Sequence, residues 1–260
     1  MNKVQSKDGI QIGYRVTGNG APLILIHGTT ADHQRWASVL SALESKFTVY
    51  AVDRRGRGES GDAESYAIER EFEDIAAVVD SIPGAVCLLG HSYGAICSME
   101  AALLTKKVSK LILYEPPVPA GIEIYPTVVV DRIQELVREG DRDGAVSTFF
   151  SDIVRMPWKE LEMLRSLPTW KSRVASAHTI PREMRSSEGY RFIPERFRDF
   201  ATPTLLLLGG ASPAFLKNGT QLVHQSLRAS RIVIMPGQQH TAMNTAPELF
   251  TDEVLNFLLE

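Results

Sequence analysis

Six short apolar runs, separated by stretches with helical patterns, constrain the fold of this chain of 260 residues more than any other feature. Their hydrophobic residues follow one another without polar alternation, which is typical of strands that are buried on both faces. Strands that alternate with helices in this way form a parallel sheet covered by helices. The six runs are residues 22–28, 47–53, 85–90, 110–115, 203–210 and 231–237.

The segments around these runs complete an α/β pattern. Apolar and polar residues alternate from Ile10 to Val16, which predicts a half-buried antiparallel strand near one edge of the sheet. The last helix is expected to follow a capping box formed by Thr245 and Glu248. Between the second and third runs, residues at helical spacing should face the sheet: Phe72, Ile75, Ala76 and Val79.

The alternation of strands and helices fails between residues 116 and 199. This stretch has helical patterns but no apolar run comparable to the six strands. We therefore predict a helical insertion at 116–199, which divides one core domain into residues 1–115 and 200–260. A composition that is 44% hydrophobic supplies enough apolar side chains for the core of such a domain.

The sequence GHSYG at residues 90–94 carries the clearest chemical signal. Ser92 stands between two glycines, where an apolar run stops and a helical pattern starts. Small residues on both sides permit a tight strand-to-helix turn that lifts the serine above the sheet, near the positive end of the helix. A serine hydroxyl is a weak nucleophile at neutral pH, so Ser92 needs a base and a group that orients the base.

Four motifs in this order make the chain resemble the α/β-hydrolase family over essentially its whole length: LIHG at 25–28, DRRGRGES at 53–60, GHSYG at 90–94 and GQQH at 237–240. The resemblance implies a mostly parallel eight-stranded sheet flanked by helices, with a helical cap inserted after the sixth strand. It also implies that His240 is the base, and that the backbone N–H groups of Thr29 and Tyr93 form the oxyanion hole.

The orienting acid departs from the family pattern. The family usually carries an aspartate after the strand that precedes the last one, and Ser212 stands there in this chain. No carboxylate lies between Asp199 and Glu248 in the sequence, so realignment does not supply one. Some members of the family take the acid from the end of the preceding core strand, which is Glu115 here. Since the residue before a proline favours extended backbone, Pro116 should hold Glu115 at the strand end, beside the crevice.

Two alternatives to this assignment stay open. Glu115 could bond only to backbone near the turn, or Ser92 and His240 could act without an acid.

The substrate pocket is expected to include His33 and aromatic residues of the insertion, among them Phe149 and Trp158.

The arginine-rich segment at 53–60 has a second interpretation, an RNA-binding tract. It lacks repeats and interleaved aromatic residues and directly follows an apolar run, so we predict a turn shaped by Asp53. From Arg165 to Asp199 there are eight Lys or Arg against four Asp or Glu. This excess indicates either a solvated face or a preference for an anionic substrate.

Composition limits the partners. A formal net charge of -3 and a pI near 6.1 indicate no general attraction to nucleic acid or to anionic membranes. No stretch reaches the roughly 18 apolar residues of a membrane span and no secretory signal pattern is present, so we expect a soluble, cytoplasmic protein. The histidines and cysteines lack metal-ligand spacing, so neither a metal nor another cofactor is expected.

These features predict a serine hydrolase that cleaves a small carboxylic ester, thioester or lactone through an acyl-enzyme on Ser92. Its partner would be a small acyl substrate. Carbon–carbon bond hydrolases, acyltransferases and perhydrolases of the family keep the same serine and remain alternatives. A different alternative is a ligand-binding protein on a hydrolase scaffold, which the replacement of the usual aspartate by Ser212 suggests.

Overall fold

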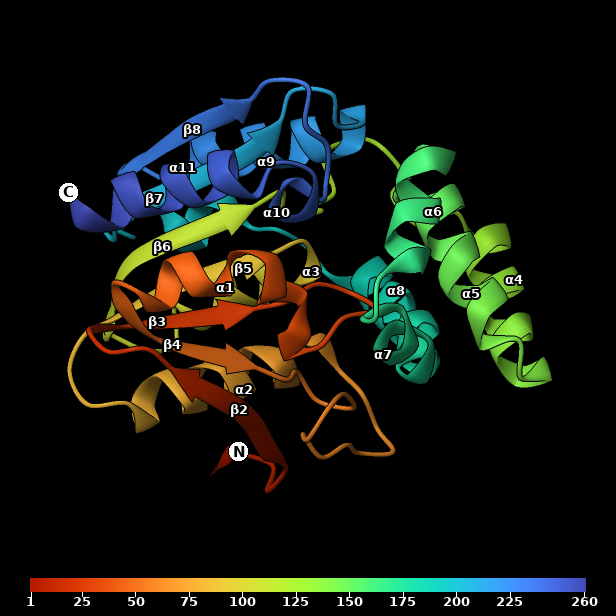
Figure 1. The fold of residues 1–260 in the computed structure, drawn as a ribbon, viewed down its shortest axis with the longest axis horizontal. Helices are drawn as coiled ribbons and strands as arrows, with labels where there is room; N and C mark the ends of the chain where they lie inside the picture. The colour runs from red at the N-terminus through yellow and green to blue at the C-terminus, as the bar shows by residue number, and fades with distance from the viewer.

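The computed structural model describes the backbone of residues 1–260 and every side chain except that of Glu188. The strands are β1 (Asn2–Gln5), β2 (Gln11–Thr17), β3 (Ala21–Ile26), β4 (Phe47–Val52), β5 (Val86–His91), β6 (Val108–Tyr114), β7 (Thr204–Gly209) and β8 (Ser230–Met235). They form one sheet in the order β1-β2-β4-β3-β5-β6-β7-β8 (Figure 1). The pairs β1–β2 and β2–β4 are antiparallel and the others are parallel. The predicted mostly parallel eight-stranded sheet is confirmed.

Helices cover both faces of this sheet. They are α1 (Ala37–Glu44), α2 (Ile68–Ser81), α3 (Tyr93–Ala101), α9 (Ala214–Ser226) and α11 (Pro247–Leu259). Successive strand residues point to opposite faces. Ile24 and Leu88 therefore pack into a core with α2, α3 and α9, and Leu25 and Leu89 pack into a core with α1 and α11. All four residues predicted to form the sheet-facing side of α2 are buried.

Two local predictions are wrong. β8, expected to be buried on both faces, is an edge strand that pairs only with β7, and Ile234 is 59% exposed. α11 begins at Pro247, and no side chain caps its N-terminus. The predicted cap residue, Thr245, is instead the last residue of the short helix α10 (Ala242–Thr245), and Ala246 is the N-cap residue of α11. The hydroxyl of Thr245 donates instead to the side-chain oxygen of Gln238 at 2.6 Å.

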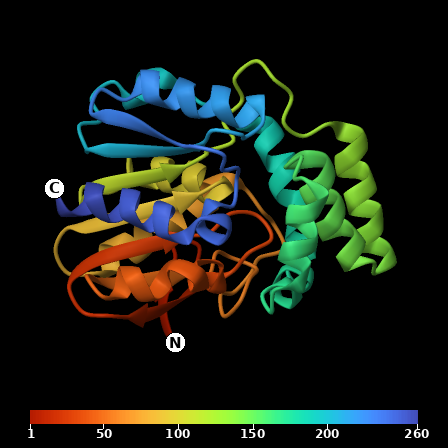
Figure 2. The ribbon, with the colours of Figure 1, turned by 45° about the horizontal axis from the view of Figure 1, so that its top comes forward.

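Five helices between β6 and β7 form a separate layer beside the carboxyl ends of the parallel strands (Figures 1 and 2). They are α4 (Thr127–Glu139), α5 (Arg142–Thr148), α6 (Trp158–Ser166), α7 (Trp170–Ala175) and α8 (Ile180–Gly189). We call these helices and the short η2 (Phe149–Ile153) the cap. The cap has its own apolar core, whereas Tyr190 and Phe197, which follow it, pack into the core of the sheet. The separately packed segment is thus shorter than the predicted 116–199.

Among the described residues, every helix falls short of the length and apolar character that crossing a bilayer requires.

Candidate active site

Ser92 lies in the tight turn that joins β5 to α3. Its φ of 56° is in the left-handed region, which residues with a side chain rarely adopt. The turn leaves no room for a side chain at Gly94, where a Cβ atom would come within 2.3 Å of the carbonyl oxygen of His27. The motif GHSYG therefore produces the predicted strand-to-helix turn, because its glycines allow neighbouring backbone to approach closely.

Glu115 and His240 lie in direct contact, although 125 residues separate them in the sequence. Nδ1 of His240 is 2.5 Å from Oε2 of Glu115. The other carboxylate oxygen, Oε1, accepts hydrogen bonds from the backbone N–H of Gly209 at 2.7 Å and from the hydroxyl of Ser212 at 2.5 Å. Ser212 thus stands where the family usually has its acid and donates to the carboxylate that contacts the histidine.

The backbone of Glu115 differs from the prediction. Extended geometry was expected before Pro116, but Glu115 has a φ of 47°. Its N–H still donates to the carbonyl oxygen of Leu207 at 3.2 Å, so the residue stays at the carboxyl end of its strand while the chain turns sharply. Three of the four non-glycine residues with positive φ are Thr30, Ser92 and Glu115. Such strain persists only where surrounding contacts hold it, and here it gathers at the candidate site.

Two buried rings position the loop that carries His240. The hydroxyl of Tyr114 donates to the carbonyl oxygen of Gln239 and accepts from the N–H of Ala242 at 3.0 Å. Nε2 of His91 lies 2.9 Å from the carbonyl oxygen of His240, and a carbonyl oxygen only accepts, so this nitrogen carries the proton. Burial, together with the charges of His240 and Arg35, holds the pKa of His91 well below its usual value. The sequence did not indicate this role of Tyr114, because the residue lies in an apolar run that predicts a buried strand.

Ser92 and His240 line the same small cavity between the sheet and the cap. Its space for solvent is about 20 Å³, which is enough for roughly one water molecule. The cap side of this cavity is largely apolar, with Phe149, Phe150 and Val154. A second small cavity that also touches Ser92 and His240 extends toward Phe215, Leu216 and other apolar residues.

The two residues predicted to supply the oxyanion hole both lie next to Ser92. Tyr93 is the first residue of α3, a position whose N–H has no partner within the helix. Thr29 lines the cavity, and a Cβ atom on the preceding Gly28 would come within 2.8 Å of Cβ of Ser92. The loop and the helix terminus therefore both approach the serine.

Of the three residues predicted to line the pocket, only Phe149 does so. His33 lies in η1 (His33–Trp36), and its Nδ1 is 2.8 Å from Oδ1 of Asp53, so that carboxylate holds the ring outside the cavity. Trp158 is the first residue of α6 and is 66% exposed. A helix end at the surface of the cap puts this ring in solvent, so both assignments are wrong.

Two arginines line the Ser92 cavity that no motif indicated. Arg35 comes from η1 and Arg173 from α7, and they are 5% and 4% exposed. Burial and the charge of Arg173 lower the pKa of Arg35 to about 9. Burial also lowers the pKa of Arg173 to about 10. A local excess of Lys and Arg in the sequence was the only signal that pointed toward Arg173.

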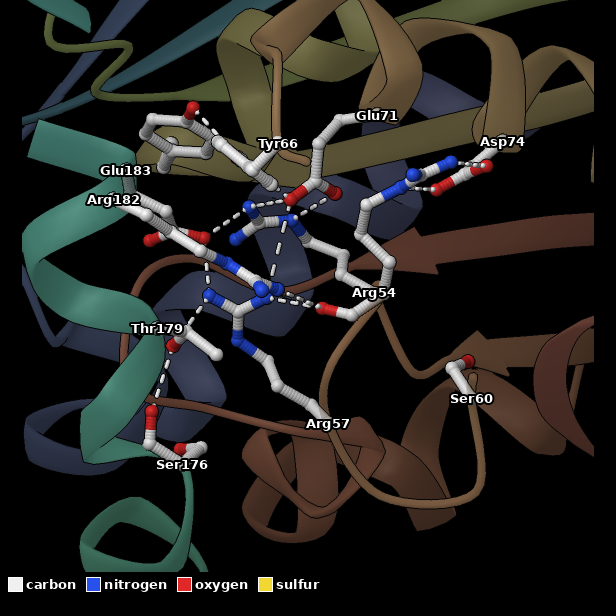
Figure 3. A network of polar contacts seen from close by, with 12 residues as sticks. Arg54, Arg57, Ser60, Tyr66, Glu71, Asp74, Ser176, Thr179, Arg182 and Glu183 are labelled. Carbon is white, nitrogen blue, oxygen red and sulfur yellow. Dashed lines mark hydrogen bonds and ion pairs between the residues drawn. The ribbon is translucent and has the colours of Figure 1, made fainter. Parts of the chain in front are cut away.

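The arginine-rich segment forms buried ion pairs instead of an exposed basic surface (Figure 3). Arg54 bonds to Glu71 at 2.7 Å and also to Glu183 of the cap helix α8. Arg57 bonds to the same oxygen of Glu183. We call Arg54, Arg57, Glu71 and Glu183 the arginine–glutamate network. Because these arginines are buried, they are not exposed for contact with the phosphate backbone of a nucleic acid. The network also joins the cap to the core.

Asp53 shapes this turn as predicted. Its carboxylate accepts hydrogen bonds from the backbone N–H groups of His33 at 2.7 Å and of Glu59 at 3.1 Å. Ligand atoms of Asp32, His33 and Asp53 lie within 4.8 Å of one another, which is close enough to hold a metal ion. Each of the three already has a hydrogen-bond partner in the loop, since Asp32 accepts from the N–H of Gln34. These bonds explain the cluster as part of the turn, and a metal-free site stays a prediction.

Comparisons with known proteins agree with this architecture. Residues 23–253 match the model of the alpha/beta hydrolase family. The chain is 26% identical to the 2-(acetamidomethylene)succinate hydrolase of Mesorhizobium japonicum, covering 96% of this chain and 92% of that protein. It is 24% identical to the pimeloyl-[acyl-carrier protein] methyl ester esterase of Nitrosomonas europaea, covering 92% and 96%.

A solved structure is similar over the whole chain. The crystal structure of an alpha/beta hydrolase from Sphaerobacter thermophilus has a TM-score of 0.86 and 33% identity, covering 99% of this chain and 100% of that one. The fold class and the family that the four sequence motifs predicted are therefore both confirmed, and the chain belongs to the alpha/beta hydrolase family.

Proposed function

We propose that the protein is a serine hydrolase that cleaves a small carboxylic ester, thioester or lactone. The contact of 2.5 Å between Glu115 and His240 is the observation that carries this proposal. A carboxylate on Nδ1 leaves Nε2 of His240 free to accept the proton of Ser92, and its charge stabilises the imidazolium that results. Ser92 and His240 line one cavity, which supports their pairing.

The reaction would follow two steps of acyl transfer. Oγ of Ser92 attacks the substrate carbonyl as His240 takes the hydroxyl proton, and the oxyanion that forms accepts hydrogen bonds from the N–H groups of Thr29 and Tyr93. His240 then gives its proton to the departing alcohol or thiol. In the second step, His240 removes a proton from water, which attacks the acyl-enzyme and releases the acid with Ser92 protonated again.

The names of two relatives support hydrolysis of an acid derivative. One is a methyl ester esterase and the other is a hydrolase of a substituted succinate. The alternative of a ligand-binding protein was based on Ser212 in place of an acid. That basis weakens, because the Ser212 hydroxyl donates to Glu115 and the carboxylate comes from the neighbouring strand.

The cavity beside Ser92 must widen before a substrate can bind. It has room for roughly one water molecule, so an acyl group enters only as side chains of the cap move aside. The apolar core of the cap is separate from that of the sheet, so cap side chains can rearrange without repacking the core of the sheet.

Hydrolysis of p-nitrophenyl acetate tests the proposal. We expect turnover by the purified protein and a loss of at least about 10³-fold in Ser92→Ala, because the nucleophile and its base act as a unit. Ser41→Ala, at an exposed position of α1, is the matched control and should keep full activity. Equal activity of Ser92→Ala and the wild type would refute the nucleophile. A panel that adds carbon–carbon, acyl-transfer and perhydrolysis substrates would show whether one of those reactions is faster.

A further inference from the structure

Arg35 and Arg173 are charged groups of the Ser92 cavity that the mechanism above does not use. Both guanidinium groups have only neutral hydrogen-bond partners among the described residues. Arg35 donates to the side-chain oxygen of Asn244 and contacts the sulfur of Met243 at 2.6 Å. Arg173 donates to the hydroxyl of Thr30 at 3.1 Å, and its Nε is buried without a partner.

Buried cations without an anion are energetically costly. The attraction of a carboxylate normally offsets the loss of hydration, and removing such a partner from a buried pair is strongly destabilising. Arg173 lies 5.4 Å from the ring centroid of Phe150, and this contact offsets only part of that loss. The two arginines also repel each other, which is one reason why the pKa of Arg35 is lowered. The cavity therefore favours the entry of an anion.

The nearest acidic groups do not fill this role. Asp32 attracts Arg173 and Glu160 attracts Arg35 electrostatically. Neither carboxylate lies within ion-pair distance of these arginines, and both accept hydrogen bonds from other groups. The carboxylate of Asp32 accepts from the backbone N–H of Gln34 at 2.8 Å. The carboxylate of Glu160 accepts from the hydroxyl of Thr241. Among the described residues, no carboxylate forms an ion pair with either guanidinium group, so the cavity favours an anion supplied by a ligand.

We infer that the substrate carries a second, ionised carboxylate, which Arg35 and Arg173 bind while the scissile carbonyl lies against Ser92. This inference rests on the proposed hydrolase function. Guanidinium groups match the planar carboxylate with paired hydrogen bonds. Because one small cavity includes both arginines and Ser92, the carboxylate and the scissile carbonyl are separated by few bonds. The substrate class is a half-ester, or a similar acid derivative, of a short dicarboxylic acid.

Two esters of equal shape test this inference. Monomethyl succinate carries the carboxylate, and methyl 4-oxopentanoate replaces it with a neutral methyl ketone. We expect kcat/KM of the wild type at pH 7 to be at least about tenfold higher for monomethyl succinate, because charge-assisted hydrogen bonds to a buried cation contribute that much. Arg173→Met should reduce this preference by at least about tenfold. A wild type without preference, or a preference that Arg173→Met leaves intact, would overturn the inference.

Arg185→Met is the control variant. Arg185 belongs to the cap helix α8, its side chain is 41% exposed, and it pairs with Asp131 outside the cavity. This variant should keep the wild-type preference between the two esters. Arg173 is chosen for the test because Arg35 also holds Asn244 and Met243 of α10, so replacing Arg35 could disturb the neighbouring His240 loop.

A binding measurement separates this inference from the proposed function. In the Ser92→Ala background, sodium succinate should raise the melting temperature, and the additional change Arg173→Met should abolish this rise. If the wild type hydrolyses neither ester, the proposed function fails while succinate binding still decides the inference. Absence of any succinate effect in Ser92→Ala would contradict anion binding, whatever the hydrolytic activity.

Discussion

Two groups of buried arginines lie at the boundary between core and cap, and they differ in whether carboxylates of the chain pair with them. In the arginine–glutamate network, two arginines face two glutamates, and Glu183 of α8 lies close to both arginines (Figure 3). The arginine pair, Arg35 and Arg173, faces an amide, a thioether, a hydroxyl and an aromatic ring. Burial alone therefore does not distinguish structural arginines from binding ones. Whether the chain itself supplies the opposite charge makes the distinction.

The largest effect should come from a third buried charge beside the cavity, the carboxylate of Glu115. If it holds and stabilises protonated His240, Glu115→Gln should lower kcat by about 10⁴-fold, as replacing the acid by its amide does in serine proteases. Ser212→Ala should stay within about tenfold of the wild type, since Gly209 still donates to the carboxylate. Steady-state kinetics with p-nitrophenyl acetate would measure both. The reverse ranking of the two variants would contradict the role of Glu115.

The next largest effect concerns stability. Glu183→Gln leaves Arg54 and Arg57 with one buried carboxylate between them, so the free energy of unfolding should fall by about 3–5 kcal/mol. Urea denaturation would measure this change. A loss below about 1 kcal/mol would show that the network is not a structural unit.

Acid titration sharpens the same comparison. Burial by itself would raise the pKa of Glu183, but the charges of Arg54 and Arg57 lower it below its usual value of 4.5. The stabilisation that Glu183 provides is therefore present above pH 4.5 and is lost as the pH falls through the folded pKa. Unfolding free energies measured at a series of acidic pH values should fall more for the wild type than for Glu183→Gln.

A smaller effect of opposite direction is expected in the arginine pair. Arg173→Met removes a buried cation that forms no ion pair with a carboxylate of the described residues, so the free energy of unfolding should change by less than about 1 kcal/mol or increase. The same denaturation experiment without added anions would measure it. A loss of unfolding free energy near that of Glu183→Gln would show that Arg173 is a structural arginine, like those of the arginine–glutamate network.

The smallest effect belongs to an exposed pair in the cap. Arg185 and Asp131 form an ion pair at 2.6 Å with side chains that are 41% and 61% exposed. Asp131→Asn should cost between about 0 and 1 kcal/mol, because solvent and salt screen such pairs. If its cost equalled that of Glu183→Gln, then burial would not be the reason for the stability of the network.

Features that depend on local pattern were predicted well from the sequence. The strand segments and the Ser92 turn each carry a short local signature, whereas the roles of His240 and Glu115 were proposed from the resemblance to the family. The partners of buried side chains were not predictable, because they depend on contacts between distant segments. Glu183 pairs with Arg54, which lies 129 residues away in the sequence. The ring of His33 contacts Asp53 and therefore lies outside the cavity. The capping box failed because a short helix occupies its place.

Reaction with a fluorophosphonate tests the central claim most directly, since the probe bonds only to an activated serine hydroxyl. Intact mass spectrometry of the folded wild type should show one added phosphonyl group, and peptide mapping should place it on Ser92. Ser92→Ala should stay unlabelled, and Glu115→Gln should react much more slowly than the wild type. Folded wild type that stays unlabelled, or a label on another residue, would contradict the account of Ser92 as a nucleophile activated by His240 and Glu115.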